Sequence, residues 1–458
     1  MKTPGPFQNF RSQLGEAQFP AMFGHSGAQL MATLYQIEQS QWWSPGDIRQ
    51  AQASQLLALV QHARQSTPYY DKKFTDLPEW DNPDALLEAW DKIPLLTRSD
   101  ISAADSALYS RAPLPLHGRQ REISTSGSTG KPMHTLSNEL VNHFYRAIAC
   151  REIMWSQRDM TRKLCAIRPD RHKTLEGVER ESWGRPMSLL YDTGPSALLY
   201  STAPISYQVD WLLEHQPSYL LSMPSNFQGL VEEFDRRGAE LDSLEQLISF
   251  AETLSPERRR LLTDFFGVPV KDLYSSVEAG YIAVQCPEHD HLHVQSEAIL
   301  VEVLDSQGVA CEPGEIGRVV LTPLHNFSAP LIRYVNGDYV EVGKPCSCGR
   351  GLPVITRVMG RERNLLTLPD GSRNWPYLAI GHWEEIAPIQ QAQVVQKSVE
   401  TLEIRLVAER QLTPEEQSAL ENFVTEQLRQ SFQYEISYHQ KLTRGRNLKF
   451  EDFISEIN

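Results

Sequence analysis

The sequence predicts an α/β protein with two domains: a large N-terminal domain of mixed sheets and helices, residues 1–360, and a small α+β C-terminal domain, residues 361–458. Three observations support this prediction. The chain has 458 residues, well above the ~250–300 at which a single hydrophobic core stops growing. Short apolar runs alternate with helical patterns before Gly360. After Gly360 the pattern changes to one of strand, strand and helix.

The N-terminal segment contains one clear helical pattern. Roughly the first 25 residues are rich in Pro, Gly and Gln, and we expect them to be only partly ordered. Apolar side chains then recur at i, i+3, i+4 and i+7, as Leu56, Leu59, Val60 and Ala63. This helix should end before Pro68, and residues 93–98 predict an extended entry to another element.

The middle of the chain predicts buried strands separated by helices. The short apolar run 247–250 and the segments 218–221 and 269–274 each fit a buried strand. The run 247–250 has the composition of a strand in a parallel sheet, because such strands are covered on both faces. Apolar residues at 227, 230, 231 and 234 repeat the helical spacing between the first two runs.

The last third of the chain predicts strands joined by tight turns and then the small domain. Residues 298–304 and 318–321 are rich in Val, Ile and Leu, with Gly and Pro between them. Residues 394–395 and 402–407 predict two strands, and 414–430 predicts a helix. This order fits an α+β domain of about one hundred residues.

Charge and composition exclude several classes of function. The net charge of −14 argues against a nucleic-acid partner, because that affinity depends on clustered Lys and Arg. The N-terminus lacks the apolar core of a signal peptide, and no stretch approaches the ~20 apolar residues of a membrane helix. Six cysteines are too few for a disulfide framework in a chain of this length. We therefore expect a cytoplasmic protein that binds neither nucleic acid nor membrane; its oligomeric state, including a homodimer, stays open.

A loop rich in hydroxyl residues and glycine is the strongest chemical signal. It comprises Ser124, Thr125, Ser126, Gly127, Ser128, Thr129, Gly130, Lys131 and Pro132. Glycine lets backbone N–H groups close around an anion, hydroxyls add donors, and lysine adds a positive charge. The pattern differs from the Walker loop. A flexible Ser/Gly linker is the alternative, but the preceding extended segment and the lysine at the exit favour a triphosphate site.

Four further segments place charged residues after strands and turns. They are 274–280 with Glu278, 333–338 with Asp338, 360–363 with Arg361, and 445–450 with Lys449. Together with the loop, and in this order, they resemble the adenylate-forming superfamily of acyl-CoA synthetases and adenylation domains. In their details, these motifs are most similar to those of the phenylacetate–CoA ligase branch and its capsule-biosynthesis relatives. The resemblance covers the chain from about residue 50 onward.

The resemblance implies a two-step reaction that uses ATP, Mg²⁺ and CoA. A carboxylate attacks the α-phosphate of ATP, which gives an acyl-adenylate and pyrophosphate; a thiol, usually that of CoA, then displaces AMP. One alternative keeps the adenylation and transfers the acyl group to a carrier-protein phosphopantetheine or to an amine. Another is a zinc-stabilised binding or scaffold protein that has lost the chemistry. The altered C-terminal segment 445–450 keeps that second alternative open.

The resemblance assigns the charge-handling roles. The 124–131 loop would hold the β- and γ-phosphates, and Glu278 would hold Mg²⁺, which prefers carboxylate and phosphate oxygen. Lys449 would hold the carboxylate and the α-phosphate together, although Arg446 or Lys441 could supply this cation instead. Taken alone, Glu278 could equally be a surface acid.

The resemblance also assigns an adenosine site and a hinge. Asp338 would accept hydrogen bonds from both ribose hydroxyls, although a Gly-Asp pair also suits an ordinary turn. Arg361 would reach phosphate or ribose, and Arg363 or a neighbour would be the hinge of the mobile C-terminal domain. The other predicted ATP-site residues are Ala251, Glu252, Thr253, Tyr274, Ser275 and Ser276.

A second group of residues predicts a structural zinc site. Cys346 and Cys348 form a Cys-x-Cys turn, and Cys286 precedes a histidine-rich stretch. Three thiolates and one imidazole suit tetrahedral zinc and leave no open position for catalysis. The resemblance favours His293 as the fourth ligand, with His291 as its rival. Free buried cysteines are the alternative.

The carboxylic acid should bind near residues 222–226, Phe250 and 274–281, by inference from the family. The rings of Phe250, Tyr274 and Tyr281 suit an aromatic or medium-sized apolar acid, and would equally suit plain core packing. We expect an aromatic acid; its identity is not given by the sequence.

Overall fold

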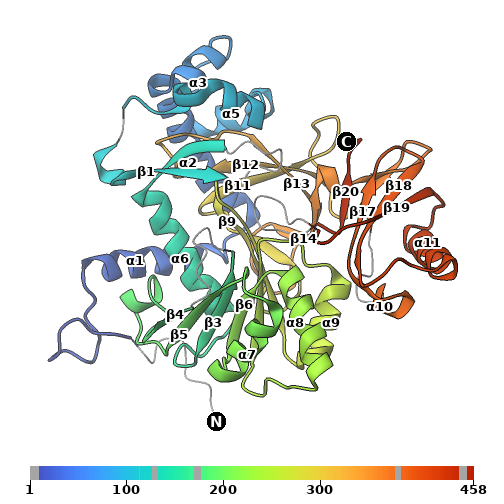
Figure 1. The fold of residues 1–458 in the computed structure, drawn as a ribbon. Coiled ribbons are helices and arrows are strands. Elements are labelled where there is room, and N and C mark those ends of the chain that lie inside the picture. Colours follow the sequence, from blue (N-terminus) through green and yellow to red (C-terminus); the bar gives the residue numbers. More distant parts are fainter. Residues whose placement is uncertain are drawn as a thin grey trace.

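A long mixed sheet forms the centre of the N-terminal part (Figure 1). The computed structural model describes residues 10–112, 114–125, 133–169, 177–376, 383–442 and 451–457. Among these residues, twelve strands pair in the order β11-β12-β13-β14-β10-β9-β8-β7-β6-β3-β5-β4. Their bounds are β3 Leu164–Arg168, β4 Val178–Arg180, β5 Ser196–Tyr200, β6 Tyr219–Ser222, β7 Gln246–Phe250, β8 Val270–Ser276, β9 Gly280–Gln285, β10 Leu292–Val294, β11 Ile299–Leu304, β12 Ile316–Pro323, β13 Tyr334–Val342 and β14 Val354–Arg361.

The parallel part of this sheet contains the buried strands that the sequence predicts. β5, β3, β6, β7 and β8 pair in parallel, and the remaining neighbours pair antiparallel. The apolar runs at 218–221, 247–250 and 269–274 coincide with β6, β7 and β8. Since parallel strands end at the same edge of a sheet, the segments after β7 and β8 emerge side by side.

Helices cover both faces of the parallel strands. α7 (Ile205–His215), α8 (Pro224–Arg237) and α9 (Pro256–Phe266) pack on one face; α1 (His25–Ser40) and α6 (Glu139–Trp155) pack on the other. Leu247 belongs to the first apolar cluster and Ile248 to the second. Successive residues of a strand point to opposite faces, which explains why β7 is a continuous apolar run.

Further helices and a hairpin complete the N-terminal part. α2 (Pro45–Ser66) contains the predicted apolar face. These residues are buried in a third apolar cluster, which also includes residues as far along the chain as Tyr334. Pro68 follows the end of α2 and begins the next helix, α3 (Pro68–Lys73). Proline suits this first turn because a backbone N–H there has no partner within the helix. The remaining bounds are α3 Pro68–Lys73, α4 Pro83–Glu88, α5 Arg98–Ala104, β1 Gln120–Thr125 and β2 Met133–Asn138.

The C-terminal part has its own sheet and apolar cluster. Its strands pair in the order β19-β18-β17-β20, and α11 packs on them. β14 ends at Arg361, and a short 3₁₀ turn at Glu362–Asn364 leads into this part. The bounds are β15 Leu366–Thr367, β16 Arg373–Asn374, α10 Trp383–Ile386, β17 Ile389–Gln396, β18 Thr401–Ala408, α11 Pro414–Leu428, β19 Gln433–Tyr438 and β20 Phe453–Ser455.

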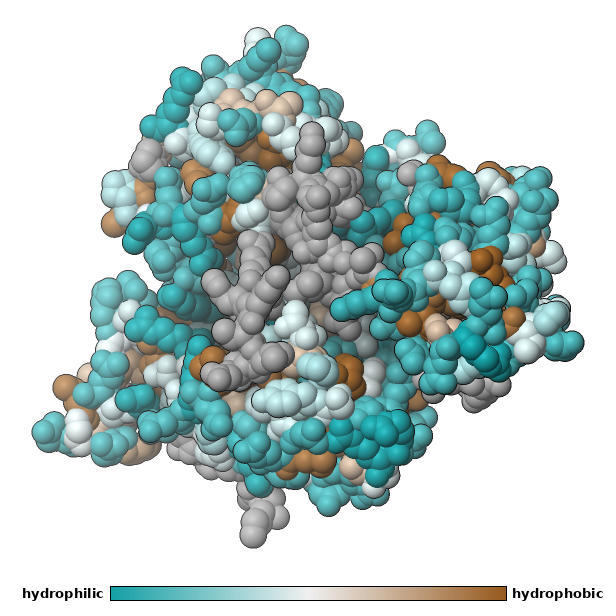
Figure 2. All heavy atoms as spheres, viewed as in Figure 1, coloured by the Kyte–Doolittle hydropathy of each residue, from teal (hydrophilic) through white to brown (hydrophobic). Residues whose placement is uncertain are grey.

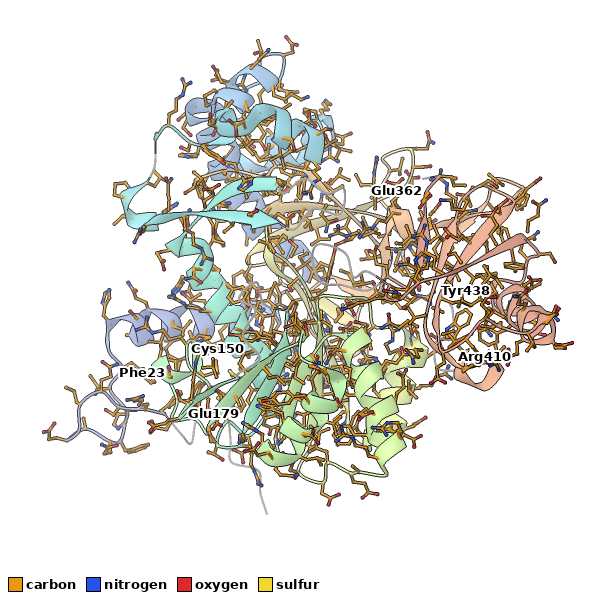
Figure 3. The ribbon with its side chains drawn as sticks, viewed as in Figure 1. Phe23, Cys150, Glu179, Glu362, Arg410 and Tyr438 are labelled. Carbon is orange, nitrogen blue, oxygen red and sulfur yellow. The ribbon has the colours of Figure 1, made fainter. Side chains whose placement is uncertain are left out.

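The surface is mainly polar. Hydrophilic side chains cover most of the face shown in Figure 2, with apolar ones scattered among them. Glu362 lies toward the large sheet, whereas Arg410 and Tyr438 lie farther out on the C-terminal part (Figure 3). Within the described residues, no helix combines the length and the apolar character needed to cross a membrane.

Candidate active site and metal centre

A cavity of about 1340 Å³ opens beside the ends of β7 and β8. Segments far apart in the sequence line it: Ser124 from β1, the residues after β7, the β8–β9 turn, Asp338 from β13, and residues 451–453. The predicted site residues among its lining are Ser124, Ala251, Glu252, Thr253, Tyr274, Ser275, Ser276, Glu278, Asp338, Arg361 and Arg363. The fold therefore brings together residues that the sequence could connect only through a family resemblance.

The predicted phosphate-binding segment lies in the sequence between two paired strands. Thr125, the last residue of β1, pairs with Met133 of β2, so the two described residues that flank 126–132 lie opposite each other. Ser126, Gly127, Ser128, Thr129, Gly130 and Lys131 lie outside the described residues, as do Lys449 and its rival Arg446. Lys441 is described and exposed, and it is not among the residues that line the cavity.

Asp338 is the centre of a polar cluster in the cavity. Its Oδ2 accepts hydrogen bonds from the Tyr274 hydroxyl at 2.9 Å and from Asn336 Nδ2 at 2.8 Å. Its Oδ1 lies 3.2 Å from Nε of Arg361. Burial, and then the charge of Asp338, raise the pKa of Tyr274 well above its usual value, so the phenol stays protonated and donates. The carboxylate is thereby held in one orientation.

Arg361 is surrounded by carboxylates. Burial opposes its charge, but Asp338, Glu278 and Glu451 together raise the pKa of Arg361. These acids come from three separate segments: β13, the β8–β9 turn and the start of the C-terminal strand region. Arg361 therefore forms an ion pair with Asp338 and also lies within electrostatic range of Glu278 and Glu451.

The segment after β7 bends sharply. Ala251 has a φ of +70°, in the left-handed region that residues other than glycine rarely adopt. The bend directs Glu252 toward the start of α8, where its carboxylate accepts from Ser225 N at 2.9 Å and Ser225 Oγ at 3.0 Å. Burial raises the pKa of Glu252, and the hydrogen bonds from Ser225 oppose that shift. The Glu252 side chain is thus engaged in holding this segment.

Asp272 is a cavity residue that the sequence analysis did not identify. It lies on β8 two residues before Tyr274, and its Oδ1 is buried without a hydrogen-bond partner among the described residues. Burial raises the pKa of Asp272 to about 6. A carboxylate inside a strand of a buried sheet was the signal that could have revealed it, since such a group is costly unless it has a role.

The C-terminal segment is tied to the cavity by several contacts. Arg363 Nε donates to Glu451 Oε1 at 3.1 Å, and Arg258 Nη2 lies 3.0 Å from Asp452 Oδ2. Asn364 Nδ2 also donates to the carbonyl of Phe453 at 2.8 Å. Lys449 precedes Glu451 by two residues in the sequence and lies outside the described residues.

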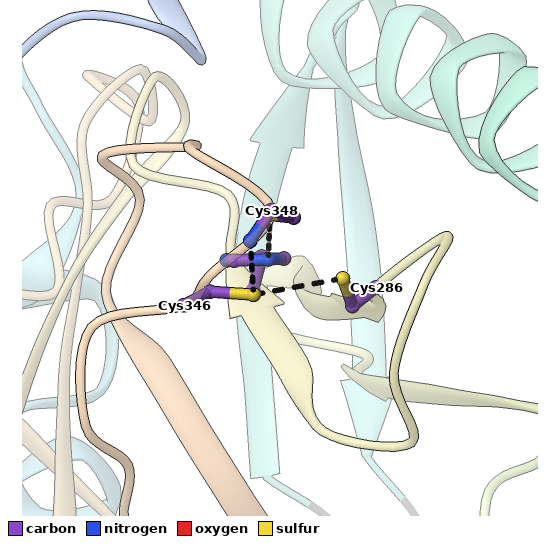
Figure 4. A group of neighbouring side chains, drawn as sticks. Cys286, Cys346 and Cys348 are labelled. Carbon is purple, nitrogen blue, oxygen red and sulfur yellow. Dashed lines mark hydrogen bonds between the residues drawn. The ribbon is translucent and has the colours of Figure 1, made fainter.

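The four predicted zinc ligands converge at a second site. One side-chain atom from each of Cys286, His293, Cys346 and Cys348 lies within 4.8 Å of all the others. Figure 4 shows Cys286, Cys346 and Cys348, with a dashed line that joins Cys286 to Cys346. Cys286 Sγ is 3.9 Å from Cys346 Sγ, and Cys348 Sγ is 3.4 Å from His293 Nε2. The donor set fits tetrahedral zinc, and four protein ligands leave no open position.

The geometry favours His293 over His291 as the fourth ligand. His293 is fully buried, and its Nδ1 lies 3.3 Å from the carbonyl of Leu352. A carbonyl can only accept, so Nδ1 carries the proton and Nε2 offers its lone pair to the thiol side. His291 is more exposed and contacts Cys346 Sγ at 3.1 Å. It lies at the rim of the site.

Comparisons with known proteins show which sequences and structures this chain resembles. No family model matches the sequence. Phenylacetate-coenzyme A ligase of Thermus thermophilus is 24% identical over 338 residues, which cover 70% of this chain and 72% of the relative. The enzyme of the same name from Escherichia coli is 23% identical over 352 residues, covering 74% and 76%.

Solved structures share the fold. The structure of 2-hydroxyisobutyryl-CoA ligase in the postadenylation state has a TM-score of 0.70 at 18% identity and covers 92% of both chains. The same ligase in the thioesterification state, with an acyl-AMP and CoA, has a TM-score of 0.59 at 19% identity and covers 91% of both chains. These similarities extend across both parts of the chain.

Proposed function

We propose that this chain, an AMP-forming acid–thiol ligase of the adenylate-forming superfamily and its phenylacetate–CoA ligase-like branch, activates an aromatic carboxylic acid and transfers it to CoA. The observation that carries the proposal is the cluster of Tyr274, Asp338 and Arg361 in one cavity with Glu278. Relatives named for phenylacetate support an aromatic acid. The rings of Phe250 and Tyr281 in the cavity lining support it as well.

Asp338 and Asp272 would hold the adenosine. The Asp338 carboxylate offers about four acceptor positions, of which Tyr274, Asn336 and Arg361 occupy three. The remaining position on Oδ1 suits one ribose hydroxyl; a second hydroxyl would have to share or displace a donor. The buried Oδ1 of Asp272 would accept from the exocyclic amine of the adenine. These contacts would orient the α-phosphate for attack.

Arg361 and the 124–131 loop would balance the negative charge of the triphosphate. Glu278 would hold Mg²⁺, which screens the phosphates when bound. Lys449 would bring the acid carboxylate to the α-phosphate, where two anions must meet. The attacking oxygen forms a bond to the α-phosphorus as the bond to the pyrophosphate oxygen breaks.

The second step would require a rearrangement of the C-terminal part. Arg363 lies in the Glu362–Asn364 turn that joins the two parts, and it is our proposed hinge. The contact between Arg258 of α9 and Asp452 would have to break when the C-terminal part rotates. The CoA thiolate would then attack the acyl carbonyl and release AMP. Zinc at Cys286, His293, Cys346 and Cys348 would serve structure only.

Product analysis tests the proposal. The protein would be incubated with ATP, Mg²⁺, CoA and one acid at a time, and acyl-CoA and AMP would be measured by mass spectrometry. We expect equal amounts of both products with an aromatic acid. AMP with no thioester would contradict CoA as the acceptor, and a thioester formed only from aliphatic acids would contradict the aromatic assignment.

A further inference from the structure

One face of α6 forms part of the cavity wall. Val141, Phe144, Tyr145 and Ile148 line the cavity, and their spacing of i, i+3, i+4 and i+7 puts them on one helix face. Tyr145 stacks on Tyr281 with ring centroids 4.8 Å apart. The wall is therefore mainly aromatic and apolar, as an aryl group requires.

His325 is a polar residue in this wall. It follows β12 by two residues, lines the cavity and stacks on Phe144 with ring centroids 3.6 Å apart and planes 6° apart. Its Nε2 lies 2.9 Å from the backbone carbonyl of Glu297. Because a carbonyl oxygen only accepts, Nε2 must carry the proton.

The other nitrogen of this ring is an unused acceptor. Burial lowers the pKa of His325 to about 4, so the ring is neutral at physiological pH and Nδ1 has a lone pair. Within the part of the chain that the structure describes, Nδ1 of His325 has no hydrogen-bond partner. An acceptor in an apolar pocket favours a ligand that carries a matching donor.

A buried ionic network supports His325 from behind. The carboxylate of Glu297 lies 2.9 Å from Nη2 of Arg151 and accepts from Ser40 at 2.6 Å. Arg151 is completely buried and also contacts Glu38 at 3.2 Å. These contacts fix the backbone of Glu297, and the stacking on Phe144 fixes the plane of the ring. The acceptor is therefore pre-organised rather than mobile.

We propose that Nδ1 of His325 reads a hydrogen-bond donor on the acyl substrate, so that the preferred acid is an aryl acid carrying a ring hydroxyl or amino group. This inference rests on the proposed function and narrows its substrate class. His325 is a specificity residue in this account and takes no part in the phosphate chemistry. The competing explanation is that His325 only packs beneath Phe144.

Pairs of acids that differ by one donor separate these explanations. Acid-dependent ATP–pyrophosphate exchange, measured without CoA, would compare a hydroxyaryl acid, its O-methyl ether and the unsubstituted acid. We expect kcat/KM to be at least about tenfold higher for the best-placed hydroxy isomer, the effect of one well-placed hydrogen bond. His325→Phe keeps a ring on Phe144 and should abolish this preference while still accepting the unsubstituted acid.

Two further variants provide controls. His325→Asn places an amide oxygen near the position of Nδ1 and should restore part of the preference. His143→Phe changes the neighbouring histidine of α6, which contacts Thr33 at 2.8 Å and is not in the cavity lining; the preference should stay unchanged. The inference is overturned if the wild type shows exchange with no preference for the hydroxyaryl acid, or if His325→Phe retains that preference. Either result leaves the proposed function standing. No exchange with any acid overturns the proposed function as well.

Discussion

The hydroxyl of Tyr274 donates to Oδ2 of Asp338 at 2.9 Å and connects β8 to β13 across the cavity. Asn336 binds both groups, at 3.1 Å to the tyrosine oxygen and 2.8 Å to the carboxylate. These hydrogen bonds fix the orientation of the Asp338 carboxylate, for which we propose a ribose-binding role. Pre-organisation of this kind lowers the cost of binding, because the ordering is done in folding.

Removal of this hydroxyl should weaken ATP binding. In Tyr274→Phe the carboxylate of Asp338 loses one donor and gains freedom to rotate. We expect the KM for ATP to rise about tenfold, because a hydrogen bond to a charged acceptor contributes roughly 1.5 kcal/mol. The KM for the acid should change little. Tyr339→Phe, on β13 next to Asp338 but not in the cavity lining, is the matched control. Equal effects of the two changes would contradict the role of Tyr274.

The metal centre should contain one zinc ion per chain. Cys346→Ser should lose the zinc and lower the melting temperature by roughly 5–10 °C, because a structural metal stabilises only the folded state. Cys311→Ser, a change at a cysteine outside the cluster, should keep both the zinc and the melting temperature. Elemental analysis and thermal unfolding measure these outcomes. Wild-type protein purified without zinc would refute the site.

Asp272 should make stability depend on pH. Its pKa is raised from 3.8 to about 6 in the folded protein, so the folded state holds a proton that the unfolded state has released between these values. The protonated Asp272 therefore contributes free energy of folding that is fully present below its unfolded pKa and is lost as the pH rises through about 6. Asp272→Asn should be more stable than the wild type at pH 7.5, by on the order of 1–3 kcal/mol, and this advantage should shrink toward pH 4.

A matched substitution nearby controls for that experiment. Asp290→Asn removes an exposed carboxylate that lies 3.5 Å from Arg259, and should leave the shape of the stability profile unchanged. Chemical unfolding at several pH values measures the difference for each variant. An advantage of Asp272→Asn that is the same at pH 4 and pH 7.5 would argue that the carboxyl has an ordinary pKa.

Lys449 should be needed for adenylation alone. Lys449→Ala should reduce acyl-adenylate formation roughly 100-fold or more, the scale of removing one charge-stabilising group. Conversion of a supplied acyl-adenylate to acyl-CoA should continue. Lys441→Ala, at an exposed residue that is not in the cavity lining, is the control. If Arg446→Ala shows the loss and Lys449→Ala does not, the catalytic cation is Arg446.

Much of the fold could be predicted from local patterns. The segments that form β6 and β7 are mainly apolar, and the helix face at 56–63 is regular. The pairing of twelve strands into one sheet could not be predicted in this way, because β10 and β14 are joined by contacts between residues some sixty positions apart. Such register depends on tertiary packing rather than on local sequence.

Residues of the candidate site could be predicted from the sequence only where they belong to a recognisable motif. Asp338, Arg361 and the Cys-x-Cys turn stand in recognisable segments; the structure pairs Asp338 with Arg361 and groups the Cys-x-Cys turn with Cys286 and His293. Asp272 and His325 stand alone in the sequence. Their significance comes from burial and from an unused acceptor atom, which only the folded chain reveals.

Acid-dependent ATP–pyrophosphate exchange tests the central claim most directly. The assay would contain Mg²⁺ and no CoA, and would compare aryl, arylacetic, fatty and amino acids. The account predicts exchange that requires an added acid, is strongest with an aromatic acid and falls sharply in Asp338→Asn. A folded, zinc-containing protein that supports no exchange with any acid would contradict the claim that this cavity forms acyl-adenylates.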